Sequence, residues 1–274
     1  MNQKTEKVEK TKKTSILEKA RPVQETASHL TCLFYGRSGT GKTTLASTFP
    51  KPMLLLDIQD QGTSSIRDVE EVDVLPIAQW EDLEGVYWAL YGGKHKYKTV
   101  VIDTLSGLQS LALEEYRNKE GLGENDTLSR RAWGDISGSL TRWVYAFRNL
   151  SLNVIFLAQD RVRRESEDDT GDDGELDPEV GPAVIPSVAR TVCAAVNVIG
   201  NTYIKQKVFA SKKKPGTWVN KTSYMLRIGP HPYYITKLRS PRSTIIPEAL
   251  QDPSYITIYN LSIGENNGKA TQEE

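Results

Sequence analysis

The stretch from Gly36 to Thr43 reads GRSGTGKT and matches the pattern G-x-x-x-x-G-K-[ST] in full. An apolar, β-prone run precedes it, and a segment that can open a helix follows it. In this strand–loop–helix context, backbone N–H groups and the positive end of a helix hold phosphate groups. The motif predicts a nucleoside triphosphate site formed by Gly36, Arg37, Ser38, Gly39, Thr40, Gly41, Lys42, Thr43 and Thr44.

Two loop residues and one later carboxylate have specific expected roles. The Lys42 ammonium would reach the β- and γ-phosphates, and the Thr43 hydroxyl would ligate Mg²⁺. The apolar run that ends in Asp103 follows the loop by about 60 residues. A carboxylate at the end of such a strand can hold a water of the Mg²⁺ shell. Thr43 and Asp103 are therefore the predicted metal-site residues.

Two further positions are candidates for sensing the γ-phosphate. A strand-like run from Asn153 to Ala158 ends in Gln159, whose amide could touch the γ-phosphate; the alternative is an ordinary polar residue at a strand end. Lys237 and Arg239 are two residues apart, so their side chains would leave the same face of a strand. Such a pair suits the γ-phosphate of a neighbouring subunit, as an arginine finger, although a solvated strand end has the same pattern.

The elements that must position these residues alternate between strand and helix. Apolar strand-like runs and helix-like segments follow one another over Met53–Asp57, Trp80–Tyr91, Thr99–Asp103, Leu105–Lys119, 128–150 and Asn153–Ala158. This alternation predicts an α/β protein with a mostly parallel sheet and helices on both faces. After Arg190, short β-branched or aromatic runs predict an antiparallel extension, at Ala195–Gln206, Tyr224–Ile228, Tyr233–Lys237 and Ile256–Tyr259.

The organisation and composition of the chain limit the classes it can belong to. We expect one domain over residues 28–263, with a disordered segment at 1–27 and a flexible tail at 264–274. Lys+Arg and Asp+Glu balance at 35 each, so the bulk charge does not indicate a partner. The two cysteines, Cys32 and Cys193, are expected to be buried apolar residues rather than a disulfide. Without a long apolar stretch or a signal-peptide pattern, the chain is expected to be cytoplasmic and away from membranes.

The order of these motifs resembles the RecA-like core ATPases, which include RecA, its archaeal and eukaryotic strand-exchange relatives and the hexameric replicative helicases. More narrowly, the chain is similar to phage recombination ATPases of the Sak single-strand annealing type. The stretches that carry the resemblance span Leu30 to Pro247 and are GRSGTGKTTLASTFP, LLLDIQDQGTSSI, KYKTVVIDTLSGL, NVIFLAQD and RIGPHPYYITKLRSP. The resemblance implies a RecA-like P-loop fold that binds ATP and Mg²⁺ and forms a homo-oligomer with ATP between subunits.

The catalytic residues that the resemblance implies are incomplete at one position. RecA-like ATPases place a Glu just past the second strand to polarise the attacking water, and here Gln59 stands at that place. Gln can orient a water but cannot take its proton, so Asp60 is the candidate replacement and slow hydrolysis is expected. The implied catalytic set is Lys42, Gln59, Asp60, Gln159, Lys237 and Arg239.

Two loops are implied to face DNA. The first corresponds to Asn118–Trp133, where Arg130, Arg131 and Trp133 combine positive charge with a stacking surface, as single-stranded DNA requires. A helix N-terminus with a core Trp remains an equal alternative. The second loop carries the basic residues Arg161, Arg163 and Arg164.

An acidic run from Glu165 to Glu179 follows these arginines and holds nine carboxylates. These charges would repel a phosphate backbone, so this run either swings aside, competes with DNA for the arginines, or is a solvated insert.

Taken with the resemblance, these motifs predict an ATP-binding, single-stranded DNA annealing protein of phage homologous recombination, acting in the bacterial host cytoplasm if phage-encoded. A single-stranded DNA-binding protein is a further candidate partner. Two alternatives remain, a ring-forming helicase or translocase and a nucleotide-dependent regulatory switch.

Overall fold

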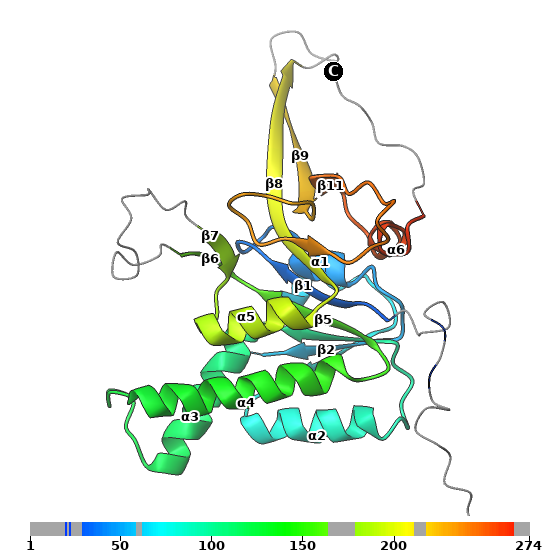
Figure 1. Cartoon of the computed structure of the whole chain (residues 1–274). Coiled ribbons are helices and arrows are strands. Elements are labelled where there is room, and N and C mark those ends of the chain that lie inside the picture. Colours follow the sequence, from blue (N-terminus) through cyan, green and yellow to red (C-terminus); the bar gives the residue numbers. More distant parts are fainter. Residues whose placement is uncertain are drawn as a thin grey trace, which may run out of the picture.

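Nine strands of the described residues form one continuous sheet with helices on both of its faces (Figure 1). The structure is a computed structural model, and it describes residues 20, 22, 29–58, 62–163, 179–210 and 218–265. The predicted disordered segment at 1–27 lies outside these residues except for positions 20 and 22, and so does the predicted tail after residue 265.

The sheet contains strands of both orientations. Its order is β11-β9-β8-β1-β5-β4-β2-β3, with β10 paired to β8. The strands of this sheet are β1 (Thr31–Tyr35), β2 (Met53–Asp57), β3 (Val72–Pro76), β4 (Thr99–Asp103), β5 (Asn153–Ala158), β8 (Val198–Ala210), β9 (Trp218–Arg227), β10 (Lys237–Leu238) and β11 (Ala249–Gln251). A separate hairpin consists of β6 (Asp160–Arg163) and β7 (Glu179–Pro182). The helices are α1 (Lys42–Ala46), the 3₁₀ helix η3 (Gly62–Ile66), α2 (Trp80–Tyr91), α3 (Leu105–Glu120), α4 (Arg130–Arg148), α5 (Pro186–Ala195) and α6 (Tyr255–Ile263).

Six neighbouring strands of the described sheet are mutually parallel, in the order β3, β2, β4, β5, β1 and β8. Their carboxyl ends therefore meet at one edge of the sheet. β5 lies between β1 and β4, which brings the residues after these three strands side by side. Parallel strands that are covered on both faces are expected to be apolar throughout, and β1, β4 and β5 are buried along their whole length. This edge is where open α/β sheets bind ligands.

Each face of the sheet has its own apolar core. α2, α3, α4 and α5 cover one face, and α1 and α6 cover the other (Figure 1). Apolar spacing explains why these helices form, since α4 buries one stripe of side chains, Ile136, Leu140, Val144 and Phe147. Within the described residues both cysteines are free, and burial raises the pKa of the Cys32 thiol. The α/β class and the mostly parallel sheet are confirmed.

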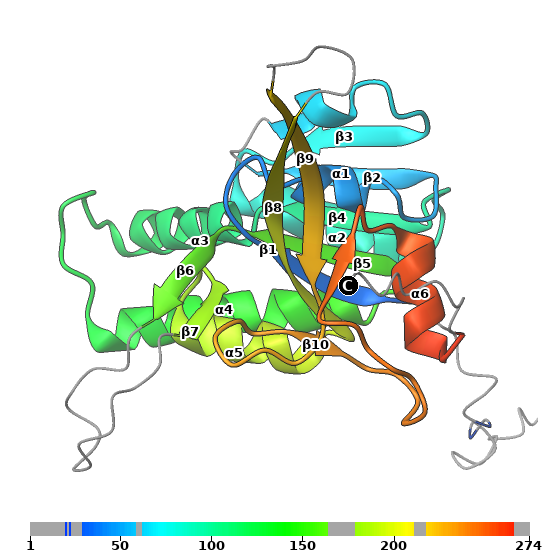
Figure 2. The same ribbon diagram turned by 90° about the horizontal axis from the view of Figure 1, so that it is seen from above.

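The antiparallel extension is also confirmed, with different elements from those expected. β8 is parallel to β1 and antiparallel to β9, and this long hairpin projects beyond the sheet (Figures 1 and 2). β11 adds to the outer edge of β9. The predicted strand Tyr233–Lys237 is wrong, because only Lys237 and Leu238 form a strand there and Tyr234 makes an isolated bridge.

The predicted strand Ile256–Tyr259 is also wrong, because these residues lie within α6. The β-branched side chains of this segment favoured a strand, but helix-capping residues lie at both of its ends. The Ser254 hydroxyl accepts from the N–H of Thr257, and Gly264 ends the helix with a φ of 83°. Among the described residues, no helix combines the length and the apolar character needed to cross a bilayer.

Candidate nucleotide-binding site

The glycine-rich loop joins β1 to α1 at the carboxyl edge of the sheet. Gly39 and Gly41 have φ values of 79° and 86°, a region that glycine adopts without a steric penalty. Gly36 lies so close to β8 that a Cβ there would stand 2.4 Å from the carbonyl oxygen of Thr202. The glycines at these positions therefore allow both the curl of the loop and its close approach to β8.

Hydrogen bonds fix the loop in this shape. The Thr40 and Thr202 hydroxyl oxygens are 2.7 Å apart, and the Thr202 hydroxyl also donates to the carbonyl of Tyr35. The Lys42 ammonium is buried and donates to the carbonyls of Gly36 and Arg37, each at 2.9 Å. The buried Lys42 ammonium is thus held inside the curl of the loop, where phosphate oxygens would bind.

The predicted metal residues lie together. The Thr43 hydroxyl donates to Oδ2 of Asp103 at 3.0 Å, and Asp103 is 3% exposed at the end of β4. A hydroxyl and a carboxylate are the oxygen donors that Mg²⁺ prefers, so this pair fits the ion. Bound there, Mg²⁺ would neutralise charge on the β- and γ-phosphates, with Thr43 and Asp103 holding it or its waters.

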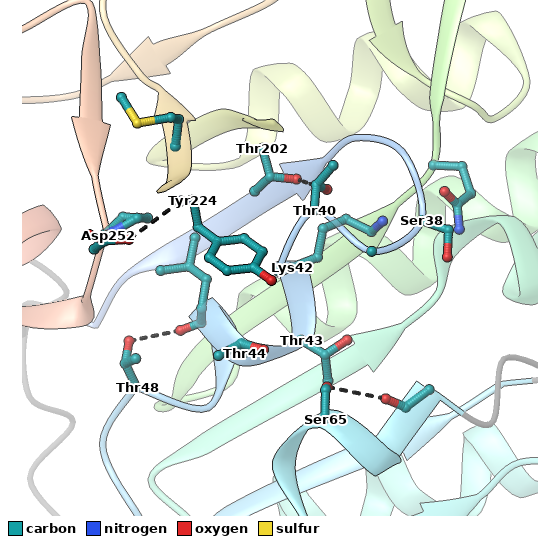
Figure 3. Close-up of a pocket in the computed structure, with 17 residues that line it drawn as sticks. Ser38, Thr40, Lys42, Thr43, Thr44, Thr48, Ser65, Thr202, Tyr224 and Asp252 are labelled. Carbon is teal, nitrogen blue, oxygen red and sulfur yellow. Dashed lines mark hydrogen bonds between the residues drawn. The ribbon is translucent and has the colours of Figure 1, made fainter. Parts of the chain in front are cut away.

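A cavity of about 640 Å³ opens above the loop. Ser38, Lys42, Thr43 and Thr44 line it from the loop and α1 (Figure 3). Gln159, at the end of β5, lines the same cavity, as its predicted role requires. The lining also includes residues that motif reasoning did not find, namely Thr48, Gly62, Ser65, Thr202, Tyr224, Met225, Asp252 and Pro253.

The match to a family model agrees with this geometry. A model described as an AAA domain matches residues 28–240, which is more than half of the 274 residues. The chain belongs to this AAA domain family. It is a P-loop ATPase domain, and nucleotide binding at the glycine-rich loop follows from this membership.

Other comparisons add little. A KaiC-like protein from the hyperthermophilic archaeon Pyrococcus horikoshii OT3 is similar in structure at 12% identity, with 72% of this chain and 78% of that chain covered and a TM-score of 0.39. A similarity at this level carries no argument about function. No curated protein sequence matches this chain significantly.

A second carboxylate of the AAA domain lies beside Asp103. Asp57 ends β2 in direct register with Asp103 on β4, so both side chains leave the same face of the sheet. Motif reasoning overlooked Asp57, although a strand ending in Asp was the signal that identified Asp103. The predicted catalytic positions Gln59 and Asp60 lie outside the described residues.

Lys237 and Arg239 lie at the C-terminal end of α5 and are not among the residues that line the cavity. The Lys237 ammonium donates to the carbonyls of Cys193 and Ala194, and Arg239 donates to that of Ala194. Burial, followed by the neighbouring Arg239 charge, lowers the pKa of Lys237. Within one subunit the pair thus caps the C-terminus of a helix.

The basic and aromatic residues of the first predicted DNA loop lie exposed at the start of α4. Arg130 and Arg131 open this helix, whose N-cap is the Ser129 hydroxyl, and both side chains are exposed. The helix-N-terminus alternative is correct in this respect, but its core Trp is not, because Trp133 is 40% exposed.

The second predicted DNA loop begins on β6. Arg161 is exposed there, and Arg163 pairs with Glu179 of β7 through the backbone. Arg164 and the acidic run up to residue 178 lie outside the described residues. The α3–α4 connection and the β6–β7 hairpin project from the same side of the molecule in both views (left in Figures 1 and 2).

Proposed function

We propose that this AAA domain binds ATP with Mg²⁺ and, as a homo-oligomer, binds and anneals single-stranded DNA in phage recombination, like the Sak-type proteins it resembles. One observation carries the DNA part of the proposal. Gln159 lines the nucleotide cavity, and the next residue begins β6, which presents the exposed Arg161. A contact to nucleotide at Gln159 is therefore adjacent in the chain to a surface strand that presents the exposed Arg161.

The hairpin is attached firmly enough to transmit such a contact. The carbonyl of Gln159 accepts from the N–H of Ala183 at 2.8 Å, just after β7. Val180 of β7 exchanges backbone hydrogen bonds with Tyr233 and Ile235, at 2.7 and 3.0 Å. Because Gln159 is bonded to Ala183, a shift of Gln159 on γ-phosphate binding would move the hairpin relative to Tyr233 and Ile235.

The start of α4 supplies the second part of the proposed DNA surface. Arg130 and Arg131 offer two exposed guanidinium groups, and Trp133 offers an exposed ring on the same helical turn. The N-terminal end of this helix adds a positive partial charge. Guanidinium groups bind phosphates and an indole ring stacks on bases, which suits an unpaired strand.

In the proposed oligomer, ATP lies between subunits, and Lys237 and Arg239 reach the neighbour's γ-phosphate. With Gln59 in place of a Glu, hydrolysis is slow and ATP binding itself favours the DNA-binding state. The two alternatives differ from this proposal in their ATP hydrolysis. A helicase or translocase hydrolyses ATP fast, and a regulatory switch hydrolyses it at a rate that does not depend on DNA.

Arg130→Ala and Arg131→Ala are each expected to weaken single-stranded DNA binding and to flatten its salt dependence. Each phosphate contact contributes about 0.7 to the slope of log affinity against log salt on single strands, so each variant should lose about that amount. Trp133→Ala should weaken binding with the slope unchanged, because stacking releases no counterions. Fluorescence anisotropy over a salt series measures both quantities.

Arg142→Ala is the matched control, since it removes the same charge from an exposed position further along α4. It should bind like the wild type. If Arg130→Ala and Arg131→Ala keep the wild-type slope, the start of α4 is not part of the DNA surface.

A further inference from the structure

One side of the nucleotide cavity is walled by residues that phosphate chemistry does not use. Thr48, Tyr224, Asp252 and Pro253 form this wall. They come from three separate regions, namely the chain after α1, β9, and the turn between β11 and α6. In Figure 3, Asp252 and Thr48 lie on one side of Lys42 and Ser38 lies on the other. A nucleotide with its phosphates at Lys42 would extend its base toward this wall.

Hydrogen bonds hold the wall in place. The N–H of Asp252 donates to the carbonyl of Tyr224 at 2.7 Å, and the N–H of Tyr224 points back to Oδ1 of Asp252 at 3.4 Å. The Thr48 hydroxyl accepts from the N–H of Tyr255 at 2.9 Å, which ties the start of α6 to the end of α1. These hydrogen bonds fix the relative positions of the three regions that form the wall.

The Tyr224 ring reaches from this wall across the cavity. It packs over the phosphate loop, since a Cβ on Gly41 would lie 3.1 Å from its Cδ1 atom. Figure 3 shows the ring between Asp252 and Lys42. The side chain is 46% exposed although it lines the cavity, so an aromatic surface is available to a ligand. Aromatic rings in such positions stack on nucleic-acid bases of any sequence.

Asp252 adds selectivity to this aromatic surface. Its φ is 46°, an uncommon region for a residue other than glycine that Asp tolerates better than most. Its carboxylate takes two long hydrogen bonds, from the N–H of Tyr224 at 3.4 Å and from Nε2 of Gln251 at 3.3 Å. A carboxylate offers about four acceptor positions and no donor, so capacity remains for a ligand N–H.

We propose that Tyr224 and Asp252 recognise the base of the bound nucleotide, with the ring packed against adenine and the Asp252 carboxylate accepting from its 6-amino group. This inference rests on the proposed function for its ligand, ATP. The phosphate loop itself contacts only phosphates, so selection among nucleoside triphosphates requires a wall of this kind. An acceptor-only group also disfavours guanine, which carries an oxygen at the same ring position.

Calorimetric titration of the full chain with ATP and with purine riboside triphosphate tests the proposal. The second ligand carries hydrogen in place of the 6-amino group. The wild type should bind ATP about tenfold more tightly, the size of one hydrogen bond to a charged group at a partly exposed site. Asp252→Gly should reduce this ratio to about one by weakening ATP alone, since glycine accepts the φ of 46°. Tyr224→Leu should weaken both ligands and leave the ratio unchanged.

Glu71→Gly is the matched control. Glu71 is the other described non-glycine residue with a comparable positive φ, 58°, and it is exposed and outside the cavity lining. It should keep the tenfold ratio. Equal binding of the two ligands by the wild type, or a tenfold ratio that survives Asp252→Gly, would overturn the role of Asp252. Unchanged affinities in Tyr224→Leu would overturn the role of the ring. A wild type that binds neither triphosphate would instead overturn the ATP assignment itself, and the wild-type ratio decides the matter even if a variant fails to fold.

Discussion

Replacing Lys42 by alanine is expected to weaken ATP binding at least tenfold while the fold survives. The ammonium is the point charge for the β- and γ-phosphates, and charge-assisted hydrogen bonds contribute about 1.5–3 kcal/mol each. In the structure it donates to the carbonyls of Gly36 and Arg37, which belong to the phosphate loop and not to the strands or to either apolar core, so the fold is expected to survive its removal. Titration calorimetry with Mg²⁺ and ATP measures the loss.

The control for Lys42→Ala is Lys94→Ala, which removes an exposed ammonium from the connection between α2 and β4. That connection enters β4 at the opposite edge of the sheet from the phosphate loop, so ATP affinity should not change. An unchanged dissociation constant in Lys42→Ala would contradict the assignment of the phosphate loop.

Arg239→Ala is expected to abolish most ATPase activity, because arginine fingers contribute about 10³–10⁵-fold to phosphoryl transfer. If Arg239 acts across the subunit interface, mixing this variant with Lys42→Ala should restore part of the activity. In mixed oligomers some interfaces pair an intact phosphate loop with an intact finger. The readout is steady-state phosphate release from oligomers that are shown to contain both variants.

The rival role for Arg239 is the cap it forms within its own subunit, on the carbonyl of Ala194. A cap predicts a lower melting temperature in Arg239→Ala and no recovery on mixing. Arg242→Ala, an exposed arginine three residues later, controls for the loss of one charge. No recovery in verified mixed oligomers would remove the finger from the account and leave the cap.

Local signals were enough to predict the phosphate side of the site. Three strands were predicted to the residue, namely Met53–Asp57, Thr99–Asp103 and Asn153–Ala158, because buried parallel strands are apolar along their length. Since each was correctly bounded, the residues at or just after their carboxyl ends, such as Asp103, were placed correctly too. The contact from Thr43 to Asp103 then follows from the sheet order.

The base side of the cavity could not be predicted in this way. Tyr224 and Asp252 reach the phosphate loop only because β8 pairs with β1 and carries β9 and β11 with it. No local pattern encodes such long-range pairing. α6 was missed for a different reason, because Ile256 and Thr257 are β-branched and outweighed the local helix caps at Ser254 and Gly264. Packing of Tyr255 against Phe49, with ring centroids 4.9 Å apart, also supports the helix.

The most direct test of the account is binding of the full chain to a labelled single-stranded oligonucleotide at low salt, with and without ATP and Mg²⁺. The account predicts tight binding with nucleotide, weaker binding without it, a preference over duplex of the same sequence, and faster annealing of complementary strands. A protein that binds ATP but ignores single-stranded DNA under these conditions would contradict it, and a nucleotide-dependent switch would then be the better description.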